Sequence, residues 1–156
     1  MTEIERKFRL ASLPEAALAA SSVPISQGYL FVDKGELRIR SKGGRCYLTA
    51  KSEGSIARDE WETEVPTWVF GFLWPHTEGR RIEKTRYTIP HGQYKLEIDD
   101  YRGSLTGLVT MECEFPNEDE AGKFSLPSWA AGAVDVTIRK EYKNKALAIR
   151  GLPDST

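Results

Sequence analysis

Ionic side chains stand at every second position in several segments of this chain. The segment "EIERK" at residues 3–7 places Glu3, Glu5 and Lys7 in one alternating set. Carboxylates are the oxygen ligands that hard divalent cations prefer, whereas Arg and Lys bind anions such as phosphates. Acids and bases mixed on one surface therefore indicate chemistry on a phosphate chain that is bridged by a metal ion.

The same alternation recurs along most of the chain. Successive side chains of a β-strand point to opposite faces, so the alternation predicts strands with one ionic face and one apolar face. In "ELRIRS", for example, Arg38 and Arg40 alternate with Leu37 and Ile39. The other ionic positions of this kind are Lys51, Glu60, Glu62, Glu64, Lys84, Arg86, Glu97, Asp99, Glu112 and Glu114.

These ionic faces have two possible locations. They are either the solvated outer faces of an antiparallel sheet or the inner wall of a barrel. Moving one ion from water to a dry interior costs on the order of 20 kcal/mol in the idealised limit. If the faces converge, the interior is therefore a hydrated tunnel that holds metal ions and an anion.

Four segments are expected to be helical. The first is "SLPEAALAASS" at 12–22, which Ser12 caps with Glu15 in a capping box. The second is "TWVFGFLW" at 67–74, whose apolar residues predict a packed lid. The third, "NEDEAGKF" at 117–124, has Asn117 as its cap. The last runs from about residue 137 to Gly151.

Composition limits the classes of function. The chain has 156 residues, which suits one domain over 1–156. The formal net charge of −1 gives no basic excess for nucleic acid or anionic lipid. No segment approaches the roughly 20 apolar residues of a membrane span, and the opening residues form no apolar signal run. Cys46 and Cys113 lack motif spacing, which favours packing roles in a reducing cytoplasm.

An ordered series of blocks carries a family resemblance from residue 3 to about residue 148. The blocks are "EIERK", "QGYL", "LRIR", "YLTAK", "EWETE", "EKTR", "LEIDDY", "GLVTMECEF", "LPSW" and "DVTIRKEYKNKALA". Together they resemble a bacterial member of the CYTH family, the triphosphate tunnel metalloenzymes. The resemblance implies an α+β chain, mainly antiparallel β, with an eight-stranded closed β-barrel and flanking helices. It also implies hydrolysis or transfer on a triphosphate with Mg²⁺ or Mn²⁺.

The resemblance also assigns roles to the ionic residues. We expect Glu5, Lys7, Glu62 and Glu114 to be catalytic. The substrate-binding set is Lys7, Tyr29, Arg38, Arg40, Lys51, Arg58, Lys84 and Arg86. The metal set is Glu3, Glu5, Glu60, Glu62, Asp99, Glu112 and Glu114.

One departure from the family pattern lies near the C-terminus. Members often carry an acid after "VT" and an Arg before the Tyr, whereas this chain has Arg139 and Glu141 at those places. If the two residues form an ion pair, the pair is preserved in reverse. If the acid binds metal, a ligand has been lost.

The expected function is metal-dependent hydrolysis of inorganic triphosphate to pyrophosphate and phosphate. Class IV adenylate cyclase and thiamine triphosphatase activities are alternatives within the family. A non-catalytic barrel that binds polyphosphate or a nucleotide is an alternative of another class, and a structural barrel with solvated charges is a further one. We expect a small-molecule triphosphate as partner, no nucleic acid or membrane, and a monomer or homodimer.

Overall fold

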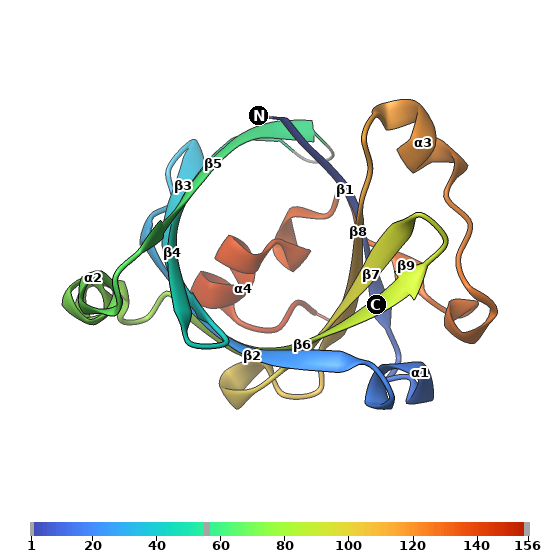
Figure 1. Cartoon of the computed structure of the whole chain (residues 1–156), viewed down its shortest axis with the longest axis horizontal. Coiled ribbons are helices and arrows are strands. Elements are labelled where there is room, and N and C mark those ends of the chain that lie inside the picture. Colours follow the sequence, from blue (N-terminus) through green and yellow to red (C-terminus); the bar gives the residue numbers. More distant parts are fainter. Residues whose placement is uncertain (1, 55–56, 155–156) are drawn as a thin grey trace.

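The fold is a sheet that closes on itself (Figure 1). The computed structural model describes residues 2–54 and 57–154, and for residues 2 and 3 only the backbone. The strands are β1 (Thr2–Leu10), β2 (Ser21–Phe31), β3 (Gly35–Lys42), β4 (Arg45–Ser52), β5 (Ala57–Val65), β6 (Arg81–His91), β7 (Tyr94–Tyr101), β8 (Val109–Glu114) and β9 (Val134–Asp135). The α-helices are α1 (Glu15–Leu18), α2 (Thr67–Leu73), α3 (Glu118–Lys123) and α4 (Asn144–Arg150).

Eight of these strands form the barrel, and all of their pairings are antiparallel. Their order is β5-β4-β3-β2-β6-β7-β8-β1, and β5 then pairs with β1 to close the ring. The two-residue β9 pairs with the C-terminal end of β1, where Val134 is opposite Arg9. The predicted eight-stranded antiparallel barrel is thus confirmed.

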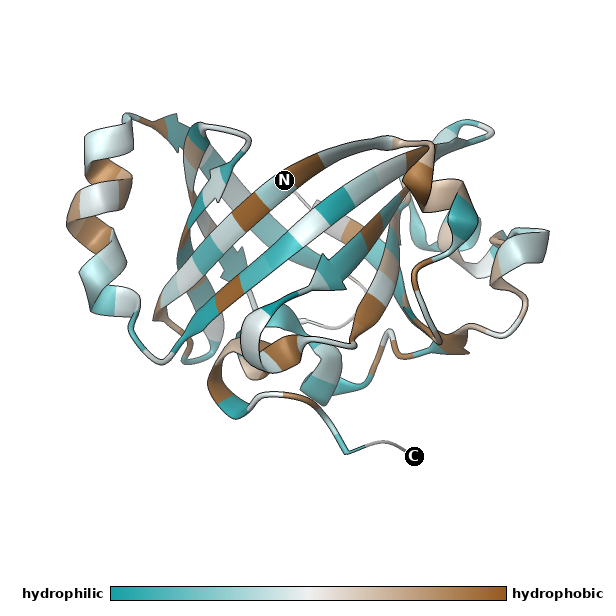
Figure 2. Cartoon of the chain, turned by 90° about the horizontal axis from the view of Figure 1, so that it is seen from below, coloured by the Kyte–Doolittle hydropathy of each residue, from teal (hydrophilic) through white to brown (hydrophobic). Residues whose placement is uncertain are grey.

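The main apolar core lies outside the barrel. Phe8, Leu96, Ile98 and Met111 on the outer faces of β1, β7 and β8 are at most 2% exposed. They pack with residues of α1, α3 and the segment that follows α3. Figure 2 shows the alternation along the strands as bands of apolar and hydrophilic residues. With the apolar faces covered from outside, the ionic faces point inward.

A second apolar cluster secures the C-terminal segment at one end of the barrel. Tyr29 and Tyr101 from the strands are buried against Val136, Tyr142 and Leu147. Figure 1 shows α4 and the chain leading to it lying across the barrel opening. Within the described residues, no helix is long and apolar enough to cross a membrane.

The helix predictions at the two ends of the chain were wrong in extent. The first helix is only Glu15–Leu18, and Pro14 rather than Ser12 is at its N-cap position, without a side-chain cap. The chain then has to join the barrel, where Ser21 is already paired with Thr88. The last helix is preceded by a 3-10 turn, Lys140–Tyr142, because hydrogen bonds to the barrel hold this part of the chain.

The other two helices formed as predicted, with one difference in packing. Helix α2 ends in a 3-10 turn at Trp74–Thr77. Its Trp68 and Phe72 are 71% and 68% exposed, so the expected packed lid was wrong for these two side chains. Asn117 caps α3 as predicted, because its side chain accepts a 2.8 Å hydrogen bond from the Glu120 amide.

We expect Asn117→Ala to lower the free energy of unfolding by about 1 kcal/mol, the usual contribution of an N-cap. Ser12→Ala is the matched control, because Ser12 does not cap α1. Urea unfolding of both variants measures the difference. Equal midpoints for Asn117→Ala and the unsubstituted protein would show that the cap does not stabilise α3.

Candidate active site

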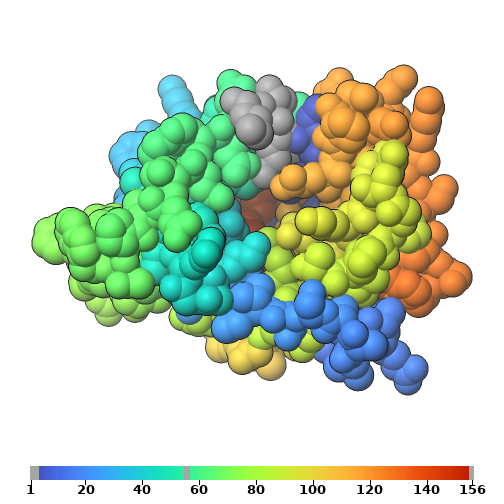
Figure 3. Space-filling model, in the orientation of Figure 1, coloured from blue at the N-terminus to red at the C-terminus, as the bar shows by residue number. Residues whose placement is uncertain are grey.

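The inner faces of the barrel surround an ionic cavity of about 190 Å³. A single water needs only roughly 10–15 Å³ of such space, so the interior is roomy enough to be hydrated. Figure 3 shows the hollow between the strands, with residues of the C-terminal segment at its base. The lining residues are Glu5, Lys7, Glu36, Arg38, Arg40, Lys42, Lys51, Arg58, Glu60, Glu62, Arg86, Glu97, Glu112, Glu114, Val136, Thr137, Arg139, Tyr142, Lys143 and Asn144.

The cations of the cavity are crowded and mostly buried. Arg38, Arg40 and Arg86 come from β3 and β6 and are at most 8% exposed. Burial, together with the like charges of Arg38 and Arg86, lowers the pKa of Arg40 to about 10. The Nε atoms of Arg38 and Arg40 are buried without a hydrogen-bond partner among the described residues. A bound polyanion would accept hydrogen bonds from these donors and would reduce the repulsion between the guanidinium groups.

Most of the cavity carboxylates come from three consecutive strands of the ring, β8, β1 and β5. Glu5 on β1 is directly opposite Glu114 on β8, and Lys7 is opposite Glu112. On β5, which pairs with β1 to close the ring, Glu60 and Glu62 line the cavity, and Glu62 accepts a 2.6 Å hydrogen bond from Thr49. Neighbouring acids of this kind are a donor set that a hard divalent cation requires.

Glu112 lies between the acids and the cations. Burial would raise its pKa, but Lys7, Arg86 and Lys84 outweigh that effect and hold the pKa well below its ordinary value. Its Oε1 has no hydrogen-bond partner in the described part of the chain, although ammonium and guanidinium groups lie 3.8–4.0 Å away. This buried acceptor fits a cation ligand. In the described residues, however, no three His, Cys, Asp or Glu side chains are already gathered around one point.

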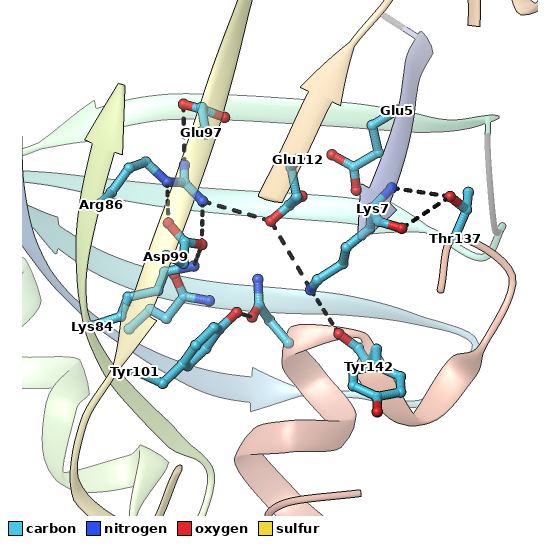
Figure 4. A network of polar contacts seen from close by, with 12 residues as sticks. Glu5, Lys7, Lys84, Arg86, Glu97, Asp99, Tyr101, Glu112, Thr137 and Tyr142 are labelled. Atoms are coloured by element: carbon cyan, nitrogen blue, oxygen red, sulfur yellow. Dashed lines mark hydrogen bonds and ion pairs between the residues drawn. The ribbon is translucent and has the colours of Figure 1, made fainter. Parts of the chain in front are cut away.

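Asp99 and Lys84 are fully buried, and they form an ionic group with Arg86, which lines the cavity. Lys84 Nζ lies 2.7 Å from Asp99, and Arg86 makes two hydrogen bonds of 2.8 and 2.9 Å to the same carboxylate (Figure 4). Burial would raise the pKa of Asp99, but Arg86 and Lys84 reverse this and hold it below its ordinary value. Burial lowers the pKa of Lys84 to about 7, against the opposing effect of Asp99. Asp99 therefore orients Arg86 toward the cavity.

Lys7 joins the strand wall to the C-terminal segment. Its Nζ donates a 2.6 Å hydrogen bond to the Tyr142 carbonyl, and its backbone N–H donates to Thr137 Oγ1 at 3.0 Å (Figure 4). Glu112 is 4.0 Å from the same ammonium group. The ammonium is thus held at the junction of β1, β8 and the C-terminal segment.

Most of the predicted site residues line this cavity, but three of the described ones do not. Lys84 and Asp99 are buried and do not reach the lining, although they share the phase of Arg86 and Glu97, and Tyr29 is buried with its hydroxyl accepting from Gln27 at 2.9 Å. The side chain of Glu3 lies outside the described residues. The predicted residues on the lining are Glu5, Lys7, Arg38, Arg40, Lys51, Arg58, Glu60, Glu62, Arg86, Glu112 and Glu114.

Five ionic lining residues are absent from the predicted catalytic, substrate-binding and metal sets: Glu36, Lys42, Glu97, Arg139 and Lys143. Glu36 and Lys42 share the phase of Arg38 and Arg40 on β3, so the alternation itself contained the signal. Glu36 is paired with Arg58 at 3.3 Å. Arg139 and Lys143 are not on a strand, and only the folding of the C-terminal segment over the barrel reveals them. The Arg139–Glu141 ion pair, at 3.1 Å, does exist, with only Arg139 on the lining.

Comparisons with known proteins agree with this geometry. The CYTH domain model matches residues 1–131. An inorganic triphosphatase from Nitrosomonas europaea is 48% identical over 153 residues, covering 96% of this chain and 98% of the relative. An inorganic triphosphatase from Acetivibrio thermocellus is 34% identical over 148 residues, covering 93% of this chain and 92% of the relative. A crystal structure of an inorganic triphosphatase is similar with a TM-score of 0.70 at 42% identity, covering 97% of this chain and 99% of that chain.

We expect Asp99→Asn to lower the free energy of unfolding by about 3–5 kcal/mol, because two buried cations would lose their counter-ion. Glu97→Gln is the control, since Glu97 is partly exposed and lies 3.4 Å from Arg86. Such a pair contributes about 0–1 kcal/mol. Denaturant unfolding compares the two variants. Equal losses would contradict a structural role for Asp99 as the counter-ion.

Proposed function

The chain belongs to the CYTH domain family, and we propose that it is a divalent-metal-dependent hydrolase of inorganic triphosphate. Water attacks a terminal phosphorus, the bond to the bridging oxygen breaks, and pyrophosphate leaves with that oxygen. The observation that carries the proposal is the crowding of buried cations around a cavity that also presents carboxylates.

The cations account for substrate binding and for stabilisation of the transition state. Phosphoryl transfer requires mainly charge neutralisation and alignment of the attacking and leaving oxygens. Arg38, Arg40 and Arg86 present guanidinium groups that bind phosphate oxygens in bidentate fashion. Lys7 on β1 and Lys51 on β4 add point charges to the lining. Because these side chains are held by the barrel, little reorganisation accompanies the reaction.

The carboxylates are suited to hold Mg²⁺ or Mn²⁺. Glu5, Glu112 and Glu114 lie on the adjacent strands β1 and β8, and Glu60 and Glu62 lie on β5. When bound, such an ion neutralises phosphate charge and orients the attacking water. A carboxylate of Glu5, Glu62 or Glu114 accepts the proton of that water. Asp99, with both oxygens occupied by Lys84 and Arg86, positions Arg86 instead.

An inorganic substrate fits this lining better than an organic triphosphate. Among the described lining residues, the single aromatic side chain is Tyr142, and the other non-ionic members are Val136, Thr137 and Asn144. A nucleobase or a thiamine ring would need an apolar or aromatic surface to bind. The lining residues therefore favour inorganic triphosphate over a cyclase or thiamine triphosphatase substrate.

The extent of the domain and its location are parts of the same proposal. We take residues 1–156 as one CYTH domain, because Thr137 and Lys143 line the cavity beyond the matched residues 1–131. Cys46 and Cys113 are both unpaired and buried, which supports a reducing cytoplasm. A monomer or homodimer remains the prediction for the assembly.

We expect the purified protein with Mg²⁺ or Mn²⁺ to release phosphate from tripolyphosphate much faster than from ATP, pyrophosphate or thiamine triphosphate. EDTA removes the metal ions and should abolish turnover. A colorimetric phosphate assay and a cyclic AMP assay measure the products. Cyclic AMP formation from ATP, or tight tripolyphosphate binding without turnover under either metal, would overturn the proposed function.

We expect Arg40→Gln to reduce kcat/KM for tripolyphosphate by at least roughly 30-fold, because loss of a buried charged partner costs about 2–5 kcal/mol. Arg45→Gln is the matched control on the next strand. Its guanidinium is 71% exposed, pairs with Glu64 and does not line the cavity. Steady-state phosphate release compares the variants. Equal activity of Arg40→Gln and Arg45→Gln would remove Arg40 from the site.

A further inference from the structure

The C-terminal segment, residues 136–144, forms an end wall of the cavity without being part of the barrel. Hydrogen bonds from the Val136 amide to the Lys7 carbonyl, at 2.9 Å, and from Lys7 Nζ to the Tyr142 carbonyl, at 2.6 Å, attach it to β1. A 2.6 Å hydrogen bond from the Tyr101 hydroxyl to Asn144 attaches it to β7. The segment is therefore held in register with the cavity at several points.

The strand walls carry equal numbers of acids and cations. Among the described lining residues, the strand cations number seven, and the strand acids also number seven. The cations are Lys7, Arg38, Arg40, Lys42, Lys51, Arg58 and Arg86, and the acids are Glu5, Glu36, Glu60, Glu62, Glu97, Glu112 and Glu114. The described strand walls are thus formally neutral.

The end wall, by contrast, is only positive. Arg139 and Lys143 line the cavity from the C-terminal segment, and no acid of this segment is on the lining in the part of the chain that the structure describes. The net positive charge of the described lining therefore comes from these two residues. A polyanionic substrate is therefore attracted to this end of the cavity, because the positive potential of the lining is greatest there.

The two side chains are placed differently but point to the same cavity. The Arg139 guanidinium lies over the Tyr142 ring, 5.0 Å from its centroid, and its Nη2 is 3.1 Å from Glu141, whose side chain is 45% exposed. Lys143 Nζ donates to the Gly54 carbonyl. Burial, together with the positive charges of Arg58 and Lys145, lowers the pKa of Lys143 to about 8, against the opposing effect of Glu36 and Glu5. An anion between these groups relieves the repulsion.

We propose that Arg139 and Lys143 bind the terminal phosphate of the substrate at the C-terminal end of the cavity. This inference rests on the proposed function, and it extends the phosphate-binding set beyond the barrel strands. The terminal phosphate carries more charge than the bridging one, so it takes the end wall that has cations without acids. The strand walls, which carry both acids and cations, hold the rest of the triphosphate and its metal ion.

A charge exchange within the Arg139–Glu141 pair tests this. The double variant Arg139→Glu with Glu141→Arg keeps the ion pair and the net charge but places a carboxylate on the lining. We expect the affinity for tripolyphosphate, measured by calorimetry without metal, to fall about 10- to 100-fold, the range for a charge-assisted hydrogen bond. The KM with metal should rise by a similar factor, with the thermal midpoint unchanged.

The matched control exchanges an exposed ion pair that does not line the cavity. Arg45 and Glu64 lie 3.7 Å apart, with their side chains 71% and 54% exposed. Arg45→Glu with Glu64→Arg should leave both the affinity and the KM unchanged. If the Arg139 and Glu141 exchange behaves like this control while the unsubstituted protein hydrolyses tripolyphosphate, the end-wall assignment is wrong and the proposed function stands.

Lys143 gives a second, independent readout. Lys143→Gln should raise the KM for tripolyphosphate, and Lys143→Arg should restore it, because a positive charge and a donor are retained. A similar loss in both variants would mean that Lys143 acts only through its contact with Gly54. Absence of turnover in the unsubstituted protein with any substrate would instead refute the proposed function.

Discussion

The structure depends on one constraint: charges that are taken out of water need partners. Asp99 shows this most clearly, because it lies fully buried with Lys84 and Arg86 around its carboxylate. The ammonium and guanidinium satisfy the acid, and the acid in turn fixes the direction of Arg86. The ionic side chains of the lining face a cavity large enough for water, so that they are solvated without leaving the protein.

This constraint also explains why the barrel has an ionic interior and an apolar outer surface. If the interior is ionic, the apolar faces of the strands must be buried on the outside. Phe8, Leu96 and Met111 pack there under α1, α3 and the segment after α3. The helices and loops are therefore the second layer of the hydrophobic core. Their removal would expose the outer faces of β1, β7 and β8 to water.

The chemistry follows from the arrangement of the same charges. A phosphate chain and a divalent ion supply opposite charges, and they satisfy the cations and the acids of the cavity together. Arg40 is the clearest case on the cationic side, with a buried Nε that has no partner among the described residues. Glu112 is the corresponding case on the acidic side. The barrel holds these groups in place before the substrate arrives, which is the main requirement for phosphoryl transfer.

The alternation of ionic and apolar residues by itself determined the strands and which residues share an ionic face, and these include most of the residues that line the cavity. It did so because the period of a strand is two, so that Arg38, Arg40, Glu60 and Glu62 identify a face without any knowledge of the fold. Family resemblance supplied the closure into a barrel, which local patterns do not contain. Only the tertiary structure decided that Asp99 and Lys84 are buried away from the lining, and that Arg139 and Lys143 complete it. The reason is that the depth of a side chain, and the contact of a non-strand segment with the barrel, depend on partners distant in the chain, such as Lys7 with Tyr142.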